Sequence, residues 1–379
     1  MAAASLRIAL AIGTYEPNHG GAAEWVYNYA RWLVRRGHKV RIICERADTG
    51  APEGCDLRAL PPSRHTKNSW RRARVLREFV SDYSADLVHD TGCLESSDIF
   101  HPLMGSLVHN WKRQLCSYPK TLAFRHLWRI RSWRDVRLQF RQSSHCRALV
   151  ACSNLAARDF KQLRRQNVVV IRNGIPLSFL PTKSDLRVLR ESLDAGDRVL
   201  MLASAANFYL KGIMTILRSL SMLDTDMRSK LLVVVTGDNQ NKTFQKFIDE
   251  HSLGKCCKLV GWVPAIDPYY HTADVFLHPT YHDAGSLSTL KAIHAGCAVV
   301  TSRFDGSAEL INSDENGIVL QNPWDAVELA NTIKRLLNPD LRNRLRNNVQ
   351  RLVSEISEDK CFMQLEDLYF SLQKGTERA

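Results

Sequence analysis

The stretch that decides the fold runs from Ala273 to Ser302 and reads ADVFLHPTYHDAGSLSTLKAIHAGCAVVTS. It opens with an apolar strand and passes through a turn of small and polar residues into a helix over Leu287–Ala295, which stops at Gly296. A second apolar strand follows over Ala298–Thr301. A buried strand, a helix and another buried strand make one unit of a parallel sheet. The stretch therefore predicts an α/β domain.

Similar short β-branched runs recur along the chain, with amphipathic helical segments between most of them. The predicted strands are Arg7–Ile12, Val40–Cys44, Leu87–His89, Ala148–Cys152, Val168–Ile171, Leu200–Ala203, Leu231–Thr236, Lys258–Val260, Val275–Leu277 and Ala298–Thr301. Strands that are apolar on both sides and alternate with helices form parallel sheets covered on both faces. Because such strands occur in both halves, we expect two Rossmann-like, doubly wound α/β domains that face a central cleft.

The length of the chain agrees with two domains. A chain of 379 residues exceeds the size at which a single hydrophobic core stops growing. The best boundary follows Asn173-Gly174-Ile175-Pro176, where a strand ends in turn residues. We expect an N-terminal domain over residues 1–175 and a C-terminal domain over 176–357, with a last helix over about 358–375.

The composition is that of an ordinary globular protein, with 45% apolar and 24% charged residues. No run of eighteen or more apolar residues occurs, and we interpret the apolar N-terminus as a first buried strand. The ten cysteines are scattered without a C-x-x-C pair, so neither a zinc site nor a disulfide framework is indicated. This cysteine usage favours a reducing cytoplasm.

Basic residues concentrate in the first half of the chain. Residues 1–180 contain 29 Lys and Arg against 14 Asp and Glu, whereas residues 181–379 contain 23 against 25. The segment 111–147 holds ten basic side chains and one acid, Asp135, with three Trp and two Phe among them. This mixture suits an anionic membrane surface. A solvated helical face and a basic pocket for an anionic acceptor remain open, and no nucleic-acid-binding motif accompanies the charge, so we expect no nucleic acid partner.

Two short motifs place glycine or lysine where a helix follows a strand. Gly20-Gly21 precedes the helix that runs to Arg36, and Lys211-Gly212 follows the strand Leu200–Ala203. Glycines at a helix N-terminus let an anion approach free backbone N–H groups, and a lysine there can neutralise a diphosphate leaving group. Taken alone, the glycines also fit an ordinary tight turn, and the lysine also fits a solvated surface position.

The turn within the opening stretch carries a third candidate site. Gly285, Ser286 and Leu287 put small residues at a helix start, where an anion is accepted. Asp283 offers oxygens that can accept hydrogen bonds from sugar hydroxyls. The next strand leads to Asp305-Gly306-Ser307-Ala308-Glu309. Ligands of doubly wound sheets bind outside the carboxyl ends of the strands, where these motifs lie.

These motifs, in this order, resemble family 4 of the retaining GT-B glycosyltransferases, or glycosyl transferases group 1, which includes the bacterial lipopolysaccharide-core glucosyltransferase. The resemblance spans about Arg7 to Tyr369. It is carried by GGAAEWVYNYARWLVRRGHKV (20–40), VVVIRNGI (168–175), LKG (210–212), the stretch 273–302 and DGSAELI (305–311).

The resemblance implies a nucleotide-sugar donor, UDP- or GDP-linked, bound mainly by the C-terminal domain, and a glycan or glycolipid acceptor bound mainly by the N-terminal domain. Lys211 would hold the donor diphosphate, the turn Gly285-Ser286-Leu287 would offer it backbone N–H groups, and the Gly20-Gly21 loop would close over it. The leaving diphosphate would assist a transfer that retains anomeric configuration. No metal or other cofactor is implied, and the last helix would pack back on the N-terminal domain.

A histidine of the N-terminal domain commonly contacts the transferring sugar in such enzymes. The candidates are His101 and His89. We prefer His101 because it ends a short strand-like run, although a structural role is open for both.

The chain departs from the family at two positions. The family's two glutamates, separated by seven residues, are Asp283 and Lys291 here. Asp283 keeps an acceptor with a shorter reach, whereas Lys291 cannot accept the hydrogen bonds from ribose hydroxyls that the second glutamate accepts. The family often has an arginine five residues before the lysine. That position is Ala206 here, an omission that the lipopolysaccharide-core glucosyltransferase shares.

Two hypotheses follow from these departures. In the first, the chain is an active, metal-independent hexosyltransferase in which Lys291 contacts an acidic donor group or an additional phosphate. It would work in lipopolysaccharide or other cell-surface polysaccharide biosynthesis, in the cytoplasm and peripherally on the inner face of the cell membrane. In the second, it is a degenerate relative that binds a glycan or a partner enzyme without catalysis.

Overall fold

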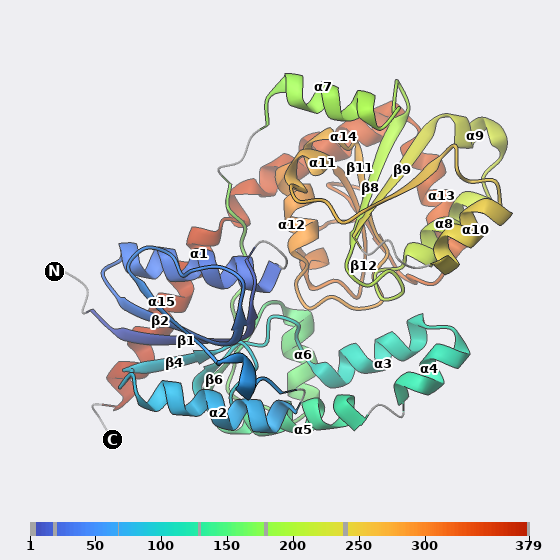
Figure 1. Cartoon of the computed structure of the whole chain (residues 1–379). Helices are drawn as coiled ribbons and strands as arrows, with labels where there is room; N and C mark the ends of the chain where they lie inside the picture. The colour runs from blue at the N-terminus through green and yellow to red at the C-terminus, as the bar shows by residue number, and fades with distance from the viewer. Residues whose placement is uncertain are drawn as a thin grey trace. The chain divides into compact units, whose positions relative to one another are not determined.

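The computed structural model describes residues 5–17, 21–66, 68–127, 130–177, 181–237 and 242–376. The chain divides into two compact units, each built around one parallel sheet (Figure 1). The first unit draws on residues 1–111, 128–172 and 361–379, and the second on residues 112–127 and 173–360. The predicted α/β class with two doubly wound sheets is confirmed.

The first unit holds a seven-stranded parallel sheet of order β3-β2-β1-β4-β5-β6-β7. Its strands are β1 (Arg7–Tyr15), β2 (Lys39–Ala47), β3 (Cys55–Ala59), β4 (Leu87–Asp90), β5 (Ser97–Phe100), β6 (Cys146–Ala151) and β7 (Val168–Val170). Its helical elements are α1 (Gly21–Arg35), η1 (Pro62–Arg64), α2 (Ser69–Ser81), the start of α3 (Leu107–Ser117), α5 (Ile130–Ser144), α6 (Asn154–Gln162) and most of α15 (Glu358–Thr376).

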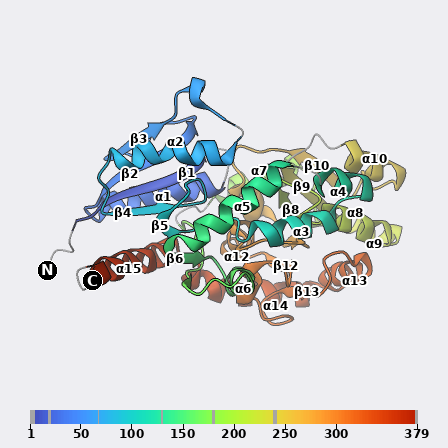
Figure 2. The same cartoon turned by 90° about the horizontal axis from the view of Figure 1, so that it is seen from below.

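Both faces of this sheet are buried, as the sequence of β1 dictates. Ile8 and Leu10 lie in a core shared with α1 and α15, whereas Ala9 and Ala11 face a smaller core with α2. Helix α15 lies beside the strands of the first unit (Figure 2). The last helix of the chain therefore completes the core of the first unit.

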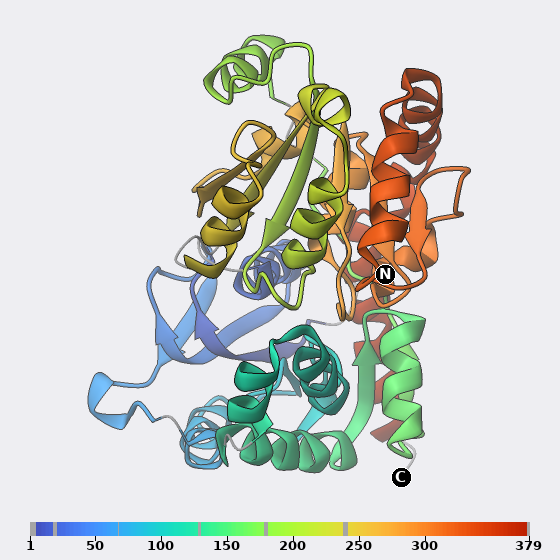
Figure 3. The same ribbon diagram turned by 90° about the vertical axis from the view of Figure 1, so that its right-hand side faces the viewer.

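The second unit holds a six-stranded parallel sheet of order β10-β9-β8-β11-β12-β13. Figure 3 shows the yellow-green strands of this sheet with helices beside them. Its strands are β8 (Val199–Ala205), β9 (Leu231–Gly237), β10 (Cys257–Gly261), β11 (Val275–His278), β12 (Ala298–Ser302) and β13 (Ile318–Leu320). Its helical elements are α4 (Lys120–Leu127), α7 (Lys183–Ser192), α8 (Ile213–Ser221), α9 (Thr225–Ser229), α10 (Lys242–Glu250), α11 (Asp267–Thr272), α12 (Leu287–His294), η2 (Gly306–Leu310), α13 (Ala326–Leu336), α14 (Pro339–Val349) and η3 (Gln350–Glu355).

This sheet is also covered on both faces. Met201 and Ala203 of β8 pack in a core with α8, α10 and α13, whereas Leu200 and Leu202 pack in a second core with α11 and α12. The alternation along β8 follows from the pleat of a strand, in which successive side chains point to opposite faces. Central strands of this unit are therefore apolar at almost every position.

Residues 112–127 group with the second unit although they precede it in the chain. The Tyr118 ring lies edge-on to the Tyr209 ring at 5.2 Å, and its hydroxyl accepts a hydrogen bond from Asn207 at 3.1 Å. The Arg113 guanidinium lies 3.8 Å from the centre of the Phe304 ring.

Among the described residues, none of the helices combines the length and the apolar composition that a membrane span requires.

Candidate active site

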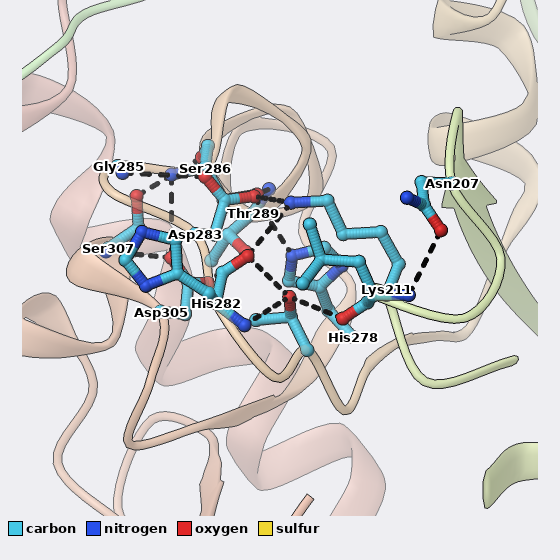
Figure 4. Close-up of polar contacts among 12 residues, drawn as sticks. Asn207, Lys211, His278, His282, Asp283, Gly285, Ser286, Thr289, Asp305 and Ser307 are labelled. Carbon is cyan, nitrogen blue, oxygen red and sulfur yellow. Dashed lines mark hydrogen bonds and ion pairs between the residues drawn. The ribbon is translucent and has the colours of Figure 1, made fainter. Parts of the chain in front are cut away.

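The turn between β11 and α12 forms a cradle at a helix N-terminus (Figure 4). The Ser286 side chain caps α12 by accepting a hydrogen bond from the Thr289 amide at 3.1 Å. The amides of Leu287 and Ser288, the first two of the helix, have no acceptor among the described residues. Free N–H groups and the positive end of the helix dipole favour an anion at this point.

The Asp305 carboxylate holds this turn in place through hydrogen bonds. One carboxylate oxygen accepts hydrogen bonds from the amides of Ser286 and Ser307 at 3.4 and 2.9 Å. The other accepts from the hydroxyls of Thr289 and Thr301 at 2.7 and 2.8 Å. Burial raises the pKa of Asp305, although His278 and these hydrogen bonds oppose the shift. The residue therefore holds the cradle in one geometry, which stabilises a preorganised anion site.

Lys211 reaches the same place from the loop between β8 and α8. Its Nζ lies 2.5 Å from the Asp283 carboxylate and 3.4 Å from the carbonyl oxygen of His282. The next residue, Gly212, caps α8 with φ +75°, and a Cβ there would lie 2.0 Å from the carbonyl oxygen of Pro279. Only glycine fits this close approach, which brings the lysine loop against the β11 turn.

Asp283 lies between two basic side chains. The oxygen that contacts Lys211 also lies 3.3 Å from Nε2 of His278, and the other oxygen accepts a hydrogen bond from the Gly285 amide at 3.4 Å. Burial raises the pKa of Asp283. Lys211 and His278 lower this pKa by more than burial raises it, so the pKa is well below its usual range. The carboxylate is ionised at neutral pH, and one of its oxygens keeps acceptor capacity for a ligand.

Lys291 lies on α12, beyond the cradle, and pairs with another helix. Its Nζ lies 3.3 Å from the Asp267 carboxylate at the start of α11. The two side chains line a pocket together with Tyr270, His271 and His294. Lys291 is thus directed to a carboxylate that the sequence did not mark as part of the site.

His101 and His89 form a buried pair in the first unit. Nδ1 of His101 lies 3.2 Å from Nε2 of His89, and Nδ1 of His89 lies 2.5 Å from the Tyr369 hydroxyl of α15. Burial lowers the pKa of His101 to about 3, and burial and His101 lower that of His89 well below its usual value. Nε2 of His101 is buried without a hydrogen-bond partner among the described residues. Both imidazoles are therefore neutral at pH 7.

The structure brings Lys211, Asp283 and the turn Gly285-Ser286-Leu287 together in the second unit. Gly21 is the first residue of α1 in the first unit, while Gly20 lies outside the described residues.

Sequence reasoning missed the supporting contacts of Asp267, His278 and Asp305. Asp305 stands three residues after the end of β12, close to the carboxyl end of the strand, a position that was a usable signal. No group of three or more His, Cys, Asp or Glu side chains within the described ranges is arranged to hold a metal ion.

Two family models match the chain, Glycosyltransferase Family 4 over residues 19–179 and Glycosyl transferases group 1 over residues 187–352. The chain is a family 4 glycosyltransferase. As a member of this retaining, metal-independent family, it transfers a sugar from a nucleotide-sugar donor.

Named relatives of this glycosyltransferase are distant in sequence and close in fold. The lipopolysaccharide glucosyltransferase WaaG of Escherichia coli is 22% identical over 344 residues, which cover 87% of this chain and 89% of WaaG. The crystal structure of WaaG, described as involved in lipopolysaccharide biosynthesis, superposes with a TM-score of 0.79 at 19% identity, over 96% of this chain and 99% of WaaG. The Anabaena protein HepE, solved with UDP-glucose, gives a TM-score of 0.71 at 17% identity, over 97% and 100% of the two chains. The fold is therefore GT-B.

Proposed function

We propose that this glycosyltransferase moves a hexosyl group from a UDP- or GDP-linked sugar to a glycan or glycolipid acceptor during the synthesis of lipopolysaccharide or another cell-surface polysaccharide. The observation that carries the proposal is the cradle of the second unit, where free amides at the start of α12 and the Lys211 ammonium converge. WaaG, a lipopolysaccharide glucosyltransferase, and HepE, solved with UDP-glucose, are relatives that support the choice of pathway and donor.

The cradle supplies the chemistry that departure of a nucleotide requires. As the bond from the sugar to the diphosphate breaks, negative charge grows on the phosphate oxygens, and preorganised N–H groups and an ammonium stabilise it. Lys211 has three donor hydrogens. Two of them are directed to Asp283 and to the carbonyl of His282, which leaves one for a phosphate oxygen. Asp283 keeps one oxygen for a hydroxyl of the transferring sugar.

The first unit is proposed to bind the acceptor and to contact the donor through His101 and the Gly20-Gly21 loop. The buried pair fixes where the protons of the imidazoles lie. When the Tyr369 hydroxyl donates to His89, His89 donates through Nε2 to His101, and Nε2 of His101 then carries a hydrogen. Such an N–H is a suitable donor to a sugar hydroxyl.

The test is a panel of UDP- and GDP-linked hexoses. We expect one nucleotide to raise the melting temperature, and its sugar to be transferred with retained anomeric configuration, as NMR of the product would show. Activity is expected to persist in EDTA, because amides and an ammonium replace a metal in this site. If no nucleotide in the panel stabilises the protein, the donor assignment is wrong and a non-catalytic binding role takes its place.

A further inference from the structure

Three aromatic side chains gather in the second unit where neighbouring strands of its sheet end. Tyr281 follows β11, Phe304 follows β12 and Trp324 follows β13, each within four residues of the end of its strand. The centre of the Trp324 ring lies 5.9 Å from that of Phe304, in a stacked arrangement, and 6.1 Å from that of Tyr281. We call these three residues the aromatic platform. Because the three strands are parallel, the platform lies at their carboxyl ends, where doubly wound sheets bind ligands.

The platform presents an indole to solvent. Trp324 is 45% exposed, whereas Tyr281 is buried and Phe304 is partly buried. An indole has few rotatable bonds, and two further rings pack against this one, so a ligand that covers it costs little side-chain entropy. The C–H groups on one face of a pyranose ring form an apolar surface, and stacking it on an indole removes apolar area from water. The platform therefore suits a sugar ring.

Two guanidinium groups lie on the Phe304 ring of the platform. The guanidinium of Arg113 lies 3.8 Å from the ring centre and that of Arg303 lies 4.8 Å from it. Arg303 is exposed, and its guanidinium forms no ion pair among the described residues. The carboxylate of Asp325, next to Trp324 in the chain, caps helix α13. Guanidinium groups bind carboxylates and phosphates through paired hydrogen bonds, so charge complementarity favours an acidic sugar over a neutral one.

The platform lies beside Asp283. The carbonyl oxygen of Phe304 accepts a hydrogen bond from the Asp283 amide at 2.9 Å, and the carbonyl oxygen of Asp283 accepts one from the Gly306 amide at 2.8 Å. These bonds fix Phe304 next to the residue that is proposed to hold the transferring sugar. Because transfer joins the acceptor to this sugar, the two sugar rings are adjacent when the bond forms. The platform is therefore well placed for a sugar residue of the acceptor.

We propose that the aromatic platform, with Arg303 and Arg113, binds an acidic sugar residue of the acceptor. The sugar ring stacks on Trp324, and its carboxylate or phosphate group pairs with the guanidinium groups. The assignment rests on the function proposed above and narrows its acceptor to a glycan that carries an acidic sugar. It adds a binding site in the second unit to the acceptor contacts proposed for the first unit.

The test measures the affinity of the wild-type chain for two pairs of tetrasaccharides by NMR titration. One tetrasaccharide ends in glucuronic acid and the other in glucose 6-phosphate, and each is paired with its uncharged counterpart, carboxyl-reduced or dephosphorylated. We expect a charged member to bind about ten-fold more tightly than its counterpart, the usual effect of hydrogen bonds between charged groups. The pair that shows this preference distinguishes a carboxylate from a phosphate. Inorganic phosphate should bind more weakly than the charged tetrasaccharide, because it has no ring to stack.

Two substitutions separate the contribution of the ring from that of the charge. Trp324→Ala should weaken the charged and the uncharged member alike, and Arg303→Gln should weaken the charged member alone, by about five-fold or more. The matched controls are Trp262→Ala, at a residue that is 56% exposed, and Arg187→Gln, which removes an exposed pair with Glu191 at 3.7 Å. Both lie elsewhere in the second unit and should leave all affinities unchanged. A nucleotide that raises the melting temperature of the wild-type chain should do so in all four variants, which verifies that they are folded.

The outcomes separate this assignment from the proposed function. Equal affinities for charged and uncharged tetrasaccharides, or a preference that survives Arg303→Gln, would overturn the acidic-sugar assignment alone. Inorganic phosphate that binds as tightly as the charged tetrasaccharide would overturn it as well, since the platform would then be a site for anions without a sugar. A wild-type chain that no UDP- or GDP-linked sugar stabilises would instead overturn the proposed function.

Discussion

The contact between Lys211 and Asp283 holds this shorter carboxylate against the lysine of the cradle. Asp283 is mostly buried, and its pKa stays low because Lys211 and His278 lie against one of its oxygens. The same contact holds the ammonium of Lys211 at the mouth of the cradle. The carboxylate is thus both a candidate sugar ligand and a positioning residue for the lysine.

We predict that Lys211→Ala lowers the transfer rate by at least about 100-fold, because the developing charge on the diphosphate loses its ammonium. Stability should also fall, by about 3 kcal/mol, since His278 is then the one basic neighbour of Asp283 among the described residues. The double variant Lys211→Ala/Asp283→Asn should regain the stability without regaining transfer. Turnover and melting temperature are measured for both variants, and unchanged turnover in Lys211→Ala would remove this residue from the site.

His89 on β4 and His101 directly after β5 form a buried histidine pair, and Tyr369 of α15 contacts His89. Folding keeps His89 and His101 neutral, whereas in the unfolded chain both take up protons near pH 6.5. Stability is therefore complete above pH 6.5 and is lost as the pH falls toward the folded pKa of His101, about 3. The loss is about 1.4 kcal/mol for each histidine at one pH unit below 6.5.

We predict that His89→Gln makes the melting temperature less dependent on pH between 7 and 5.5 than it is in the wild-type chain. His251→Gln is the matched control, because His251 is exposed in the second unit and its loss should not alter the slope. Equal slopes for the wild-type chain and His89→Gln would show that the buried pair does not control acid stability.

The sequence predicts the central strands well and the marginal strands poorly. All ten predicted strands are present, and β5 matches the strand-like run before His101, but β3 and β13 were missed. Both are edge strands, and an edge strand such as CDLRA is only partly buried and so lacks an apolar run. The candidate site follows the same logic. Lys211 and Gly285 belong to continuous motifs at strand ends, whereas the contact of His89 with Tyr369 joins residues 280 positions apart, which no local pattern encodes.

The two halves of the chain differ in net charge. Residues 1–180 carry an excess of basic residues, and residues 181–379 are nearly balanced. Large apolar side chains are exposed within the basic half, among them Phe124 at 64% and Trp133 at 51%. Exposed aromatic rings among basic residues are typical of proteins that lie on an anionic membrane. We propose that the basic half of the chain is where a glycolipid acceptor is met.

We predict that the chain sediments with vesicles containing anionic lipid and that binding weakens at least ten-fold between 0.05 and 0.5 M salt, because salt screens the basic side chains. Trp133→Ser should weaken binding several-fold further, since an apolar anchor is lost. Trp262→Ser is the matched control: this residue is 56% exposed but lies in the balanced half of the chain, so binding should not change. Equal binding to neutral vesicles at high salt, or equal effects of the two tryptophan substitutions, would contradict a membrane role for the basic half. A pocket for an anionic acceptor would then be the better explanation of its basic charge.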